Sequence, residues 1–369
     1  MRFTCEKNAL VTALNIASRT VAQKSSLSVI EGILCTAGMR LSLTGYNMET
    51  AITYEVDAEI SDPGQCVLPS KLFGDIVRRL PEGPVTVVVD EKYKVSIRAG
   101  FASFTIAAEP ADDYPELPDV GEGRGVRIPQ NALKRMISGT IFAVSENQSR
   151  PIHTGVRFEV EDTAISAIAV DGFRLARRTF HPEQPTGRTV AFVVPAQALK
   201  EVEKILSDTE DHAEFTLGTR HILFQVAGAT LVCRLLDGEF LDWKRVVPTN
   251  CPVKLVANVA DLSSSIERVG LIVSEKFKSP VRCVFSNQNL LLRTNTTIGA
   301  AEDQCAIAGD GNEMEIGFNV RYLADALKAV PSEEVTLELT NGLSPIVLTP
   351  VDEKEDFAYM VLPVRLKNS

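Results

Sequence analysis

The chain has 369 residues, of which 45% are hydrophobic and 23% charged, so it can fill modest hydrophobic cores. No apolar run approaches the roughly 18 residues of a membrane span, and the start lacks the apolar core of a signal peptide, so a cytoplasmic protein without a membrane partner is expected. The net charge of −10 by itself argues against nucleic-acid binding, since phosphate contacts come from clustered lysine and arginine.

A seven-residue block recurs three times along the chain. It reads VLPSKLF at 67–73, VVPAQAL at 193–199 and GFNVRYL at 317–323. The third positions of the blocks are 126 and 124 residues apart, close to a third of the chain. A triplicated domain is therefore the working hypothesis, because this repeat is longer than a solenoid module of roughly 20 to 50 residues and has the size of a domain.

The landmarks around these blocks recur in the same order and indicate one structural unit. Helical apolar periodicity begins at Asn8 and Asn131 and covers residues 256–273, while strands are expected to begin at Gly32, Gly155 and Val281. After the blocks, short helical stretches are predicted at 75–80, 200–206 and 324–329, and alternating strand segments at 85–89, 213–217 and 335–339. Each unit reads helix, strands, helix, strands, which predicts an α+β fold with domains at 1–122, 123–250 and 251–369. Three unrelated α+β domains that share turn residues are the alternative.

The residues that usually carry chemistry form no recognisable site. Seven cysteines are scattered without a Cys-x-x-Cys pair, mostly in apolar strand context, and we interpret them as reduced core residues. The four histidines lack the i, i+4 partner of a helical metal site, and phosphate-loop, nucleophile-elbow and dinucleotide-binding motifs are missing. The sequence therefore predicts no catalytic residue, metal or cofactor, and it favours a binding or scaffolding protein over an enzyme.

The placement of charge is more informative than its total. The predicted helices, at 8–24, 70–80, 130–144, 197–206, 258–278 and 320–329, together carry +7, and the rest of the chain carries −17. If these helices share one face of an assembly, that face is positive while the strands and loops elsewhere are acidic. Such a face could hold a polyanion through its backbone without reading sequence. The alternative is that these lysines and arginines are merely solvated and the imbalance is accidental.

Four separated segments carry a family resemblance: RPIHTGVRFE at 150–159, VDGFRLA at 170–176, MEIGFNVRYL at 314–323 and YMVLPVRL at 359–366. They resemble signatures of the bacterial DNA polymerase III beta subunit family, the replicative sliding clamps, and the match runs through the whole chain in order. The resemblance implies a head-to-tail homodimer that closes a ring of six similar domains, with helices lining the hole and sheets outside. Double-stranded DNA, held without sequence preference, threads such a ring. The ring tethers the replicative polymerase for processive synthesis, has no catalytic site of its own, and also binds the clamp loader and other clamp-motif proteins.

The resemblance also implies residues for each contact. By position, the residues expected to contact DNA are Lys24, Arg78, Arg79, Arg135, Gln148 and Lys200. The dimer interface is expected to join Phe104 and Ile106 of one protomer to Leu271 and Ile272 of the other, since an unpaired apolar edge strand is an aggregation hazard. Ordinary core positions are the alternative for these four residues.

Partner proteins are expected to dock short extended peptides in an apolar cleft between the second and third domains and the C-terminal tail. Apolar walls would take leucine and aromatic anchors, while arginines and Asn319 would hold the polar atoms of the peptide. Carried over from the family motifs, the cleft comprises Arg150, His153, Val170, Gly172, Phe173, Arg174, Leu175, Leu241, Arg245, Val246, Phe277, Asn319, Tyr322, Leu343, Pro345, Val361, Leu362, Pro363, Val364 and Arg365.

Several cleft positions differ from the family pattern. His153 stands where an aliphatic residue is common, Val170 where threonine is frequent, and Leu362 and Val364 where methionines often occur. Because methionine adapts its shape to varied partners, replacing both predicts an altered peptide preference and not a loss of binding.

Two other classes of protein remain as alternatives. An enzyme could use Asp171, Arg174 and Tyr322 as polar groups in a pocket, and it would lose turnover on Asp171→Ala with its dimer intact. A monomeric triplicated peptide-binding protein would have a monomer mass in solution and no role on DNA.

Overall fold

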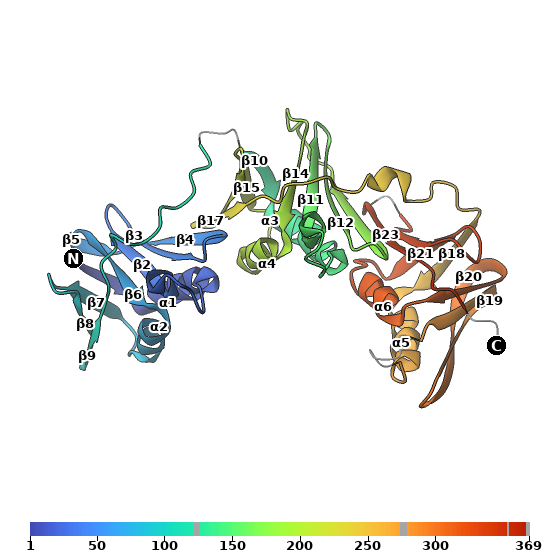
Figure 1. Cartoon of the computed structure of the whole chain (residues 1–369), viewed down its shortest axis with the longest axis horizontal. Helices are drawn as coiled ribbons and strands as arrows, with labels where there is room; N and C mark the ends of the chain where they lie inside the picture. Colours follow the sequence, from blue (N-terminus) through green and yellow to red (C-terminus); the bar gives the residue numbers. More distant parts are fainter. Residues whose placement is uncertain (122–124, 274–278, 353, 367–369) are drawn as a thin grey trace. The chain divides into compact units, whose positions relative to one another are not determined.

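In the described part of the chain the α-helices recur in pairs, two in each third (Figure 1). The computed structural model describes residues 1–121, 125–273, 279–352 and 354–366. The α-helices of these ranges are α1 (Lys7–Ala17), α2 (Ser70–Arg79), α3 (Gln130–Ser138), α4 (Ala196–Ile205), α5 (Val259–Gly270) and α6 (Val320–Lys328). Short 3-10 turns are η1 (Ser18–Thr20), η2 (Ser28–Glu31), η3 (Ile141–Ala143), η4 (Pro151–Thr154) and η5 (Trp243–Arg245). None of the helices described is long and apolar enough to cross a membrane.

The second helix of each pair begins inside the recurring block. α2, α4 and α6 each start one residue after Pro69, Pro195 and Asn319. The stretches predicted at 75–80, 200–206 and 324–329 therefore leave out the first turn of each helix, whereas the helix ranges 70–80, 197–206 and 320–329 start within one residue of the observed helices. The Asn319 side chain caps α6 by accepting a hydrogen bond from the Arg321 backbone N–H at 3.0 Å.

α5 also begins at a side-chain cap, and the stretch predicted at 256–273 was too long at both ends. Residues 256–258 end strand β18 (Val253–Asn258), and the Asn258 side chain accepts a hydrogen bond from the Asp261 backbone N–H at 3.0 Å. The helix ends at Gly270. Burial alternates along β18, where Val253, Leu255 and Ala257 are buried and the residues between them are not, as expected of a strand and not of a helix.

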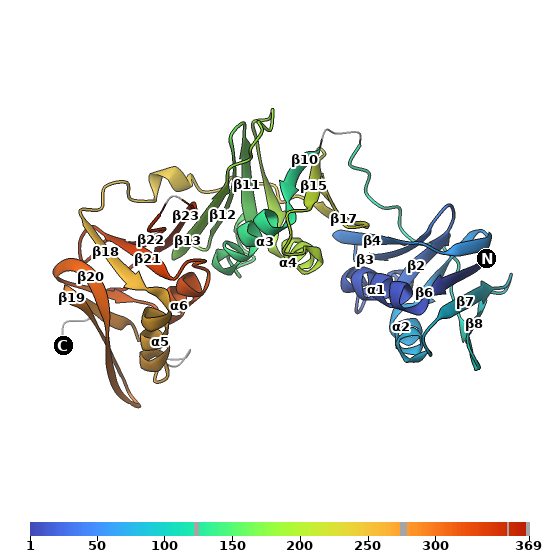
Figure 2. The ribbon, with the colours of Figure 1, turned by 180° about the vertical axis from the view of Figure 1, so that it is seen from behind.

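α2 shows how these helices pack on their sheets. Phe73, Ile76 and Val77 are buried at i, i+3 and i+4 spacing, so one apolar stripe faces the core. α1 and α2 lie side by side in both ribbon views (Figures 1 and 2). The end of α1 lies so close to the sheet that a Cβ at Gly45 would come within 2.0 Å of the Ala17 carbonyl oxygen, which requires glycine there.

Two antiparallel sheets build the first compact unit, Met1–Lys134 with Gln197–Leu235. The smaller sheet has the strand order β5 (Glu59–Asp62), β1 (Arg2–Glu6), β7 (Pro84–Val89), β8 (Lys94–Ala99) and β9 (Ala102–Ala107). The larger has the order β10 (Val126–Pro129), β15 (His212–Leu217), β16 (His221–Val226), β17 (Ala229–Arg234), β4 (Thr50–Val56), β3 (Leu41–Tyr46), β2 (Gly32–Ala37) and β6 (Gly64–Pro69). Since β17 pairs with β4, this sheet runs from the first repeat into the second.

One antiparallel sheet dominates the second compact unit, Arg135–Ala196 with Leu236–Ser369. Its strand order is β14 (Val190–Pro195), β11 (Gly155–Glu161), β12 (Ala164–Val170), β13 (Arg174–Phe180), β23 (Phe357–Val361), β22 (Ile346–Thr349), β21 (Glu334–Leu339), β18, β20 (Gly299–Phe318) and β19 (Val281–Thr296). β13 pairs with β23, so this sheet runs from the second repeat into the third.

The strands confirm most of the sequence assignment. β2, β11 and β19 begin at Gly32, Gly155 and Val281, and β7, β15 and β21 cover the three alternating segments. All seven cysteines are free and buried, as their apolar context indicated. The α+β fold built from three similar parts is therefore confirmed. The domain borders near 122 and 250 stay a prediction, because both large sheets continue across the repeats.

Aromatic rings fill the core of the second unit around β23. Phe357 and Tyr359 stack with ring centroids 4.9 Å apart, and Phe142 meets Tyr359 edge-on at 5.4 Å. The Tyr359 hydroxyl donates to the Ala329 carbonyl oxygen at 3.2 Å, and burial raises the pKa of Tyr359 to about 12. β23 is thus firmly anchored at the point where it leads into the C-terminal tail.

Candidate partner-binding cleft

A cleft of about 1130 Å³ opens on the second unit. Residues 144–153, the turn between β12 and β13, and the start of α6 surround it, and Leu241 and Val246 add apolar lining beside η5. Apolar walls with a few placed polar groups are typical of a site for a peptide or small organic ligand. In the described ranges, no group of three or more His, Cys, Asp or Glu side chains could hold a metal ion.

Phe173 and Tyr322 form an aromatic wall of the cleft. Their rings stack with centroids 6.2 Å apart, and Phe173 is 60% exposed, so it offers a free face to a ligand. A tight turn presents Phe173: Gly172 has a φ of +92°, and the Asp171 carboxylate accepts hydrogen bonds from the backbone N–H groups of Phe173 and Arg174 at 2.8 and 3.0 Å. Burial raises the pKa of Tyr322, so its hydroxyl stays protonated at neutral pH.

Arg174 is largely enclosed although it lines the cleft. Its guanidinium pairs with Asp171 at 2.9 Å and with Asp325 of α6 at 2.5 Å, and only 11% of the side chain is exposed. The charged group also lies 4.5 Å from the centre of the Tyr322 ring and 5.6 Å from that of Phe142. Two of its donors therefore already bind carboxylates of the protein.

His153 brings an unpaired polar atom into an apolar part of the cleft. Its ring meets Phe240 edge-on at 5.3 Å, and Nε2 is buried without a hydrogen-bond partner in the described part of the chain. Burial lowers the pKa of His153, and the nearby Arg150 lowers it further. The ring is therefore neutral at pH 7, which reduces the cost of its apolar surroundings.

The C-terminal tail is tied to residues of the cleft by backbone hydrogen bonds. The Leu362 N–H donates to the Phe173 carbonyl oxygen at 2.8 Å, and the Val364 N–H donates to the Gly317 carbonyl oxygen at 2.7 Å. Leu362 also packs against the buried cluster that contains Val170. The tail therefore extends the apolar surface beyond the end of β23.

Half of the twenty residues predicted for the cleft line it directly: Arg150, His153, Val170, Gly172, Phe173, Arg174, Leu241, Val246, Asn319 and Tyr322. Leu175 and Val361 are buried in strands β13 and β23. The remaining described residues lie around the lining, in η5, in the loop before β22 or in the tail: Arg245, Leu343, Pro345, Leu362, Pro363, Val364 and Arg365. Phe277 lies outside the described residues.

The structure adds lining residues that were not among the twenty predicted for the cleft: Val144, Ser145, Glu146, Asn147, Ser149, Asp171, Val273, Ser279, Val320 and Arg321. Most of them directly precede or interrupt the quoted motifs. Residues 144–149 could have been suspected from their place next to Arg150, although their composition resembles that of any polar loop.

Three of the arginines predicted to contact DNA already have acidic neighbours. Arg78 and Arg79, at the end of α2, pair with Asp75 at 3.0 and 3.6 Å. Arg135 of α3 lies 3.7 Å from Glu355. Because these pairs are partly or largely exposed, they weaken the positive charge without removing it.

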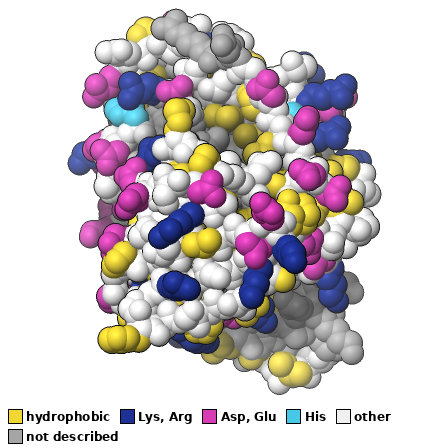
Figure 3. Space-filling view, turned by 90° about the vertical axis from the view of Figure 1, so that its left-hand side faces the viewer, with side chains coloured by type: hydrophobic (Ala, Val, Ile, Leu, Met, Phe, Trp, Pro, Cys, Tyr) yellow, Lys and Arg dark blue, Asp and Glu magenta, His cyan; other side chains and the backbone are white. Residues whose placement is uncertain are grey.

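The other three predicted DNA contacts carry no such neighbour. Lys24, in the loop after η1, and Lys200, on α4, are exposed and form no ion pair with any described residue, and Gln148 lies in an exposed turn. The face of the molecule seen in Figure 3 mixes acidic and basic side chains, with hydrophobic ones scattered between them. Because Lys24 and Lys200 have no acidic partner among the described residues, they are the strongest candidates among the six for a contact with DNA phosphates.

Six strands form the edges of the three sheets in the described part of the chain: β5 and β9, β10 and β6, and β14 and β19. Two of them, β9 and β19, concern the predicted dimer interface, since β9 carries Phe104 and β19 packs against α5, which Leu271 follows. β9 ends the five-stranded sheet and β19 ends the ten-stranded sheet. Phe104 is 41% exposed on β9, where Ile106 is partly buried. Leu271 is 84% exposed directly after α5, and Ile272 beside it is partly buried. Exposed apolar side chains near open edges are suited to sheet-to-sheet association.

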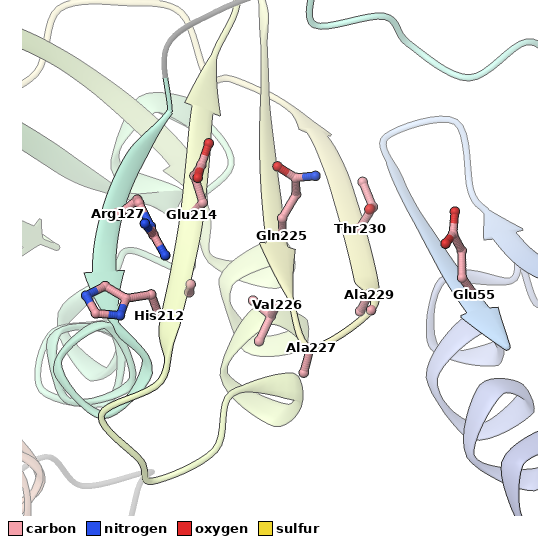
Figure 4. A pocket seen from close by; sticks show the side chains of 11 residues that line it. Glu55, Arg127, His212, Glu214, Gln225, Val226, Ala227, Ala229 and Thr230 are labelled. Carbon is pink, nitrogen blue, oxygen red and sulfur yellow. The ribbon is translucent and has the colours of Figure 1, made fainter. Parts of the chain in front are cut away.

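A second, polar hollow of about 380 Å³ lies on the first unit (Figure 4). Arg127, Glu214 and Gln225 are neighbours in register across β10, β15 and β16, and Glu55 contributes from β4. The hollow is a row of side chains on the outside of a sheet. None of its lining atoms is both buried and unpaired, so it indicates no particular ligand.

Comparison with known proteins accounts for the threefold repeat. Residues 1–118, 127–242 and 244–365 match, in turn, the families described as the N-terminal, central and C-terminal domains of the DNA polymerase III beta subunit. Three such domains in succession, together with the observed topology, define a DNA clamp. The chain belongs to the DNA polymerase III beta subunit family.

Whole-length relatives agree with this assignment. The beta sliding clamps of Staphylococcus epidermidis and Bacillus subtilis are each 30% identical to this chain and cover 99% of it, over 99% and 100% of their own lengths. Among solved structures, a putative DNA polymerase III beta subunit from Eubacterium rectale has a TM-score of 0.94 at 30% identity, over 99% of this chain and 100% of that one. The Bacillus subtilis sliding clamp has a TM-score of 0.93 at 29% identity over 100% of both chains. The function of the chain is therefore that of a DNA sliding clamp for processive synthesis, and it is not a catalytic subunit.

Proposed function

We propose that two copies of this chain close head to tail into a ring around duplex DNA, with helices toward the hole and sheets outside. The observation that carries this proposal is that β9 in the first repeat and β19 in the third are both sheet edges with an exposed apolar side chain close by, Phe104 on β9 and Leu271 after α5, which packs on β19. Contact between different edges of two copies is heterologous, and such contacts form a ring when the rotation closes. The interface would place Phe104 and Ile106 opposite Leu271 and Ile272.

The DNA contacts are proposed to be weak and independent of sequence. Lys24 and Lys200 would attract phosphates as unpaired charges, and Gln148 would add a neutral polar contact. Arg78, Arg79 and Arg135 share their charge with Asp75 or Glu355, which limits how tightly they hold a phosphate. Weak contacts suit a ring that must slide, because topology and not affinity keeps it on DNA. We place this activity in the cytoplasm, where bacterial DNA lies.

The cleft is proposed to receive an extended peptide from the replicative polymerase, the clamp loader or other partners. Phe173, Tyr322, Leu241 and Val246 would hold its apolar anchors. The Asn319 carboxamide oxygen is used to cap α6, which leaves its NH₂ group to donate to the peptide. The polar and apolar groups of the cleft are therefore arranged for a short motif with at least one aromatic or leucine side chain.

Retention on circular nicked DNA tests the ring directly. The chain, supplied with a clamp loader and ATP, is passed with the DNA through a gel-filtration column in moderate salt, and the experiment is repeated after the DNA is linearised. We expect co-elution with the circle and loss from the linear form, because a ring slides off free ends. Equal retention on both forms would show ordinary electrostatic binding, and failure on both would favour a peptide-binding scaffold.

A further inference from the structure

Arg174 connects the two elements that carry the aromatic wall of the cleft. Asp171 and Phe173 belong to the turn before β13, whereas Tyr322 and Asp325 belong to α6. The Arg174 Nε donates to Asp171 Oδ2 at 2.9 Å, and its Nη1 donates to Asp325 Oδ2 at 2.5 Å. One planar side chain therefore bridges a carboxylate on each element.

The aromatic contacts tighten this bridge. The guanidinium carbon of Arg174 lies 4.5 Å from the centre of the Tyr322 ring. The Phe173 ring, which forms the rest of the aromatic wall, stacks on Tyr322 with a centroid distance of 6.2 Å. Asp171 also accepts the backbone N–H of Phe173, so the same carboxylate orients both the arginine and the exposed phenylalanine. A shift of the guanidinium would move the two rings relative to each other.

We propose that Arg174 is a positioning residue of the cleft and not a ligand of the bound peptide. It holds Phe173 and Tyr322 at the spacing that accepts an aromatic anchor, and Asp325 holds Arg174. This inference rests on the proposed peptide-binding function. It differs from the role expected from the family motifs, in which the arginines of the cleft hold polar atoms of the peptide.

Asp325→Asn separates the two roles because Asp325 pairs with Arg174 but does not line the cleft. If Arg174 positions the wall, losing this carboxylate loosens the wall and lowers affinity by about threefold to tenfold, in the lower part of the range of coupling within a charged network. If Arg174 binds the peptide directly, the same change frees a donor and leaves affinity unchanged or raises it. The two roles therefore predict different changes in peptide affinity for Asp325→Asn: a loss if Arg174 positions the wall, and no loss if it binds the peptide.

The probe is a fluorescein-labelled decapeptide with a leucine and a phenylalanine anchor, titrated with the full chain and followed by fluorescence polarisation. A second peptide has alanine in place of phenylalanine. We expect Asp325→Asn to lower the affinity for the first peptide and to leave the affinity for the second unchanged, because only the phenylalanine anchor contacts the aromatic wall. Asp352→Asn is the matched control, since Asp352 is exposed and pairs only with Lys354, at 3.9 Å, among the described residues. It should leave both affinities unchanged.

Arg174→Lys provides a second test, because lysine keeps the charge but lacks the planar fork that bridges two carboxylates. It should reproduce the selective loss seen with Asp325→Asn, and the double variant should lose no more than either single one. Equal affinity of wild type and Asp325→Asn, or an equal loss for both peptides, would overturn the positioning role alone. If the wild-type chain binds neither peptide, the proposed cleft and this inference both fail.

Discussion

The ion pair between Arg178 and Glu355 offers a quantitative test of how the second and third repeats are joined. Arg178 of β13 is 6% exposed and Glu355, just before β23, is 26% exposed, and they form a short charge-assisted hydrogen bond. Glu355→Gln keeps the size of the side chain and removes its charge. The variant leaves a buried guanidinium without its carboxylate.

The expected loss of stability follows from this burial. Removing one partner of a fully buried pair costs about 3–5 kcal/mol. Because Glu355 keeps some solvent contact and glutamine can still accept a hydrogen bond, we expect about 2 kcal/mol. For a unit of this size, such a loss lowers the unfolding midpoint by roughly 4–8 °C.

Differential scanning calorimetry, supported by urea unfolding, measures this loss. The matched control is Glu315→Gln, because Glu315 pairs with Arg282 at 2.6 Å in the same unit but both side chains are at least 33% exposed. Such exposed pairs contribute about 0.2–1 kcal/mol, so the control should shift the midpoint far less. Equal shifts for the two variants would refute the claim that burial determines the energy of the Arg178 pair.

Three further outcomes are expected. Leu362→Met with Val364→Met should change the ranking of a peptide panel without abolishing binding, because methionine adapts to more anchor shapes; identical affinities across the panel would contradict this. Phe104→Asp should shift sedimentation toward the monomer, whereas Val88→Asp, at a similarly exposed position on an inner strand of the same sheet, should not; a dimer in both would exclude β9 from the interface. Burial acts to raise the pKa of Asp356, but its arginine and histidine neighbours outweigh this and hold the pKa below its usual value. The stabilising contribution of the Asp356 carboxylate should be complete above about pH 4 and be lost as the pH falls further. The difference in unfolding free energy between wild type and Asp356→Asn should therefore disappear in acid. A difference that persists at about pH 2 would disprove the link between this pKa and stability.

The repeats could be read from the sequence because their signals are local. Apolar residues at i, i+3 and i+4, such as those that α2 buries, reveal a helix wherever it packs. Strand starts at Gly32, Gly155 and Val281 were equally clear. The helices predicted to start after the blocks, at 75, 200 and 324, lacked their first turn, because strand ends and first helical turns share these blocks. The ranges that start at 70, 197 and 320 agree with the observed helices within one residue.

The cleft could be anticipated only in part. The motifs at 150–159, 170–176 and 314–323 predicted which segments form the cleft, and half of the predicted residues line it. The role of Arg174 was not visible, because it depends on Asp325, which is 151 residues away in the chain. The interface residues and the predicted DNA contacts remain predictions.

By itself the sequence determined the α+β class, the threefold repeat and the buried free cysteines, because each follows from spacing or composition along the chain. The family resemblance rests on four short segments, which are equally local. The tertiary structure alone decided that two sheets run across the repeats, that β9 and β19 are among the edge strands, and which charges are already paired. The physical reason is that strand pairing and ion pairs join residues far apart in sequence. Their energies depend on distance and burial, which only the folded chain defines.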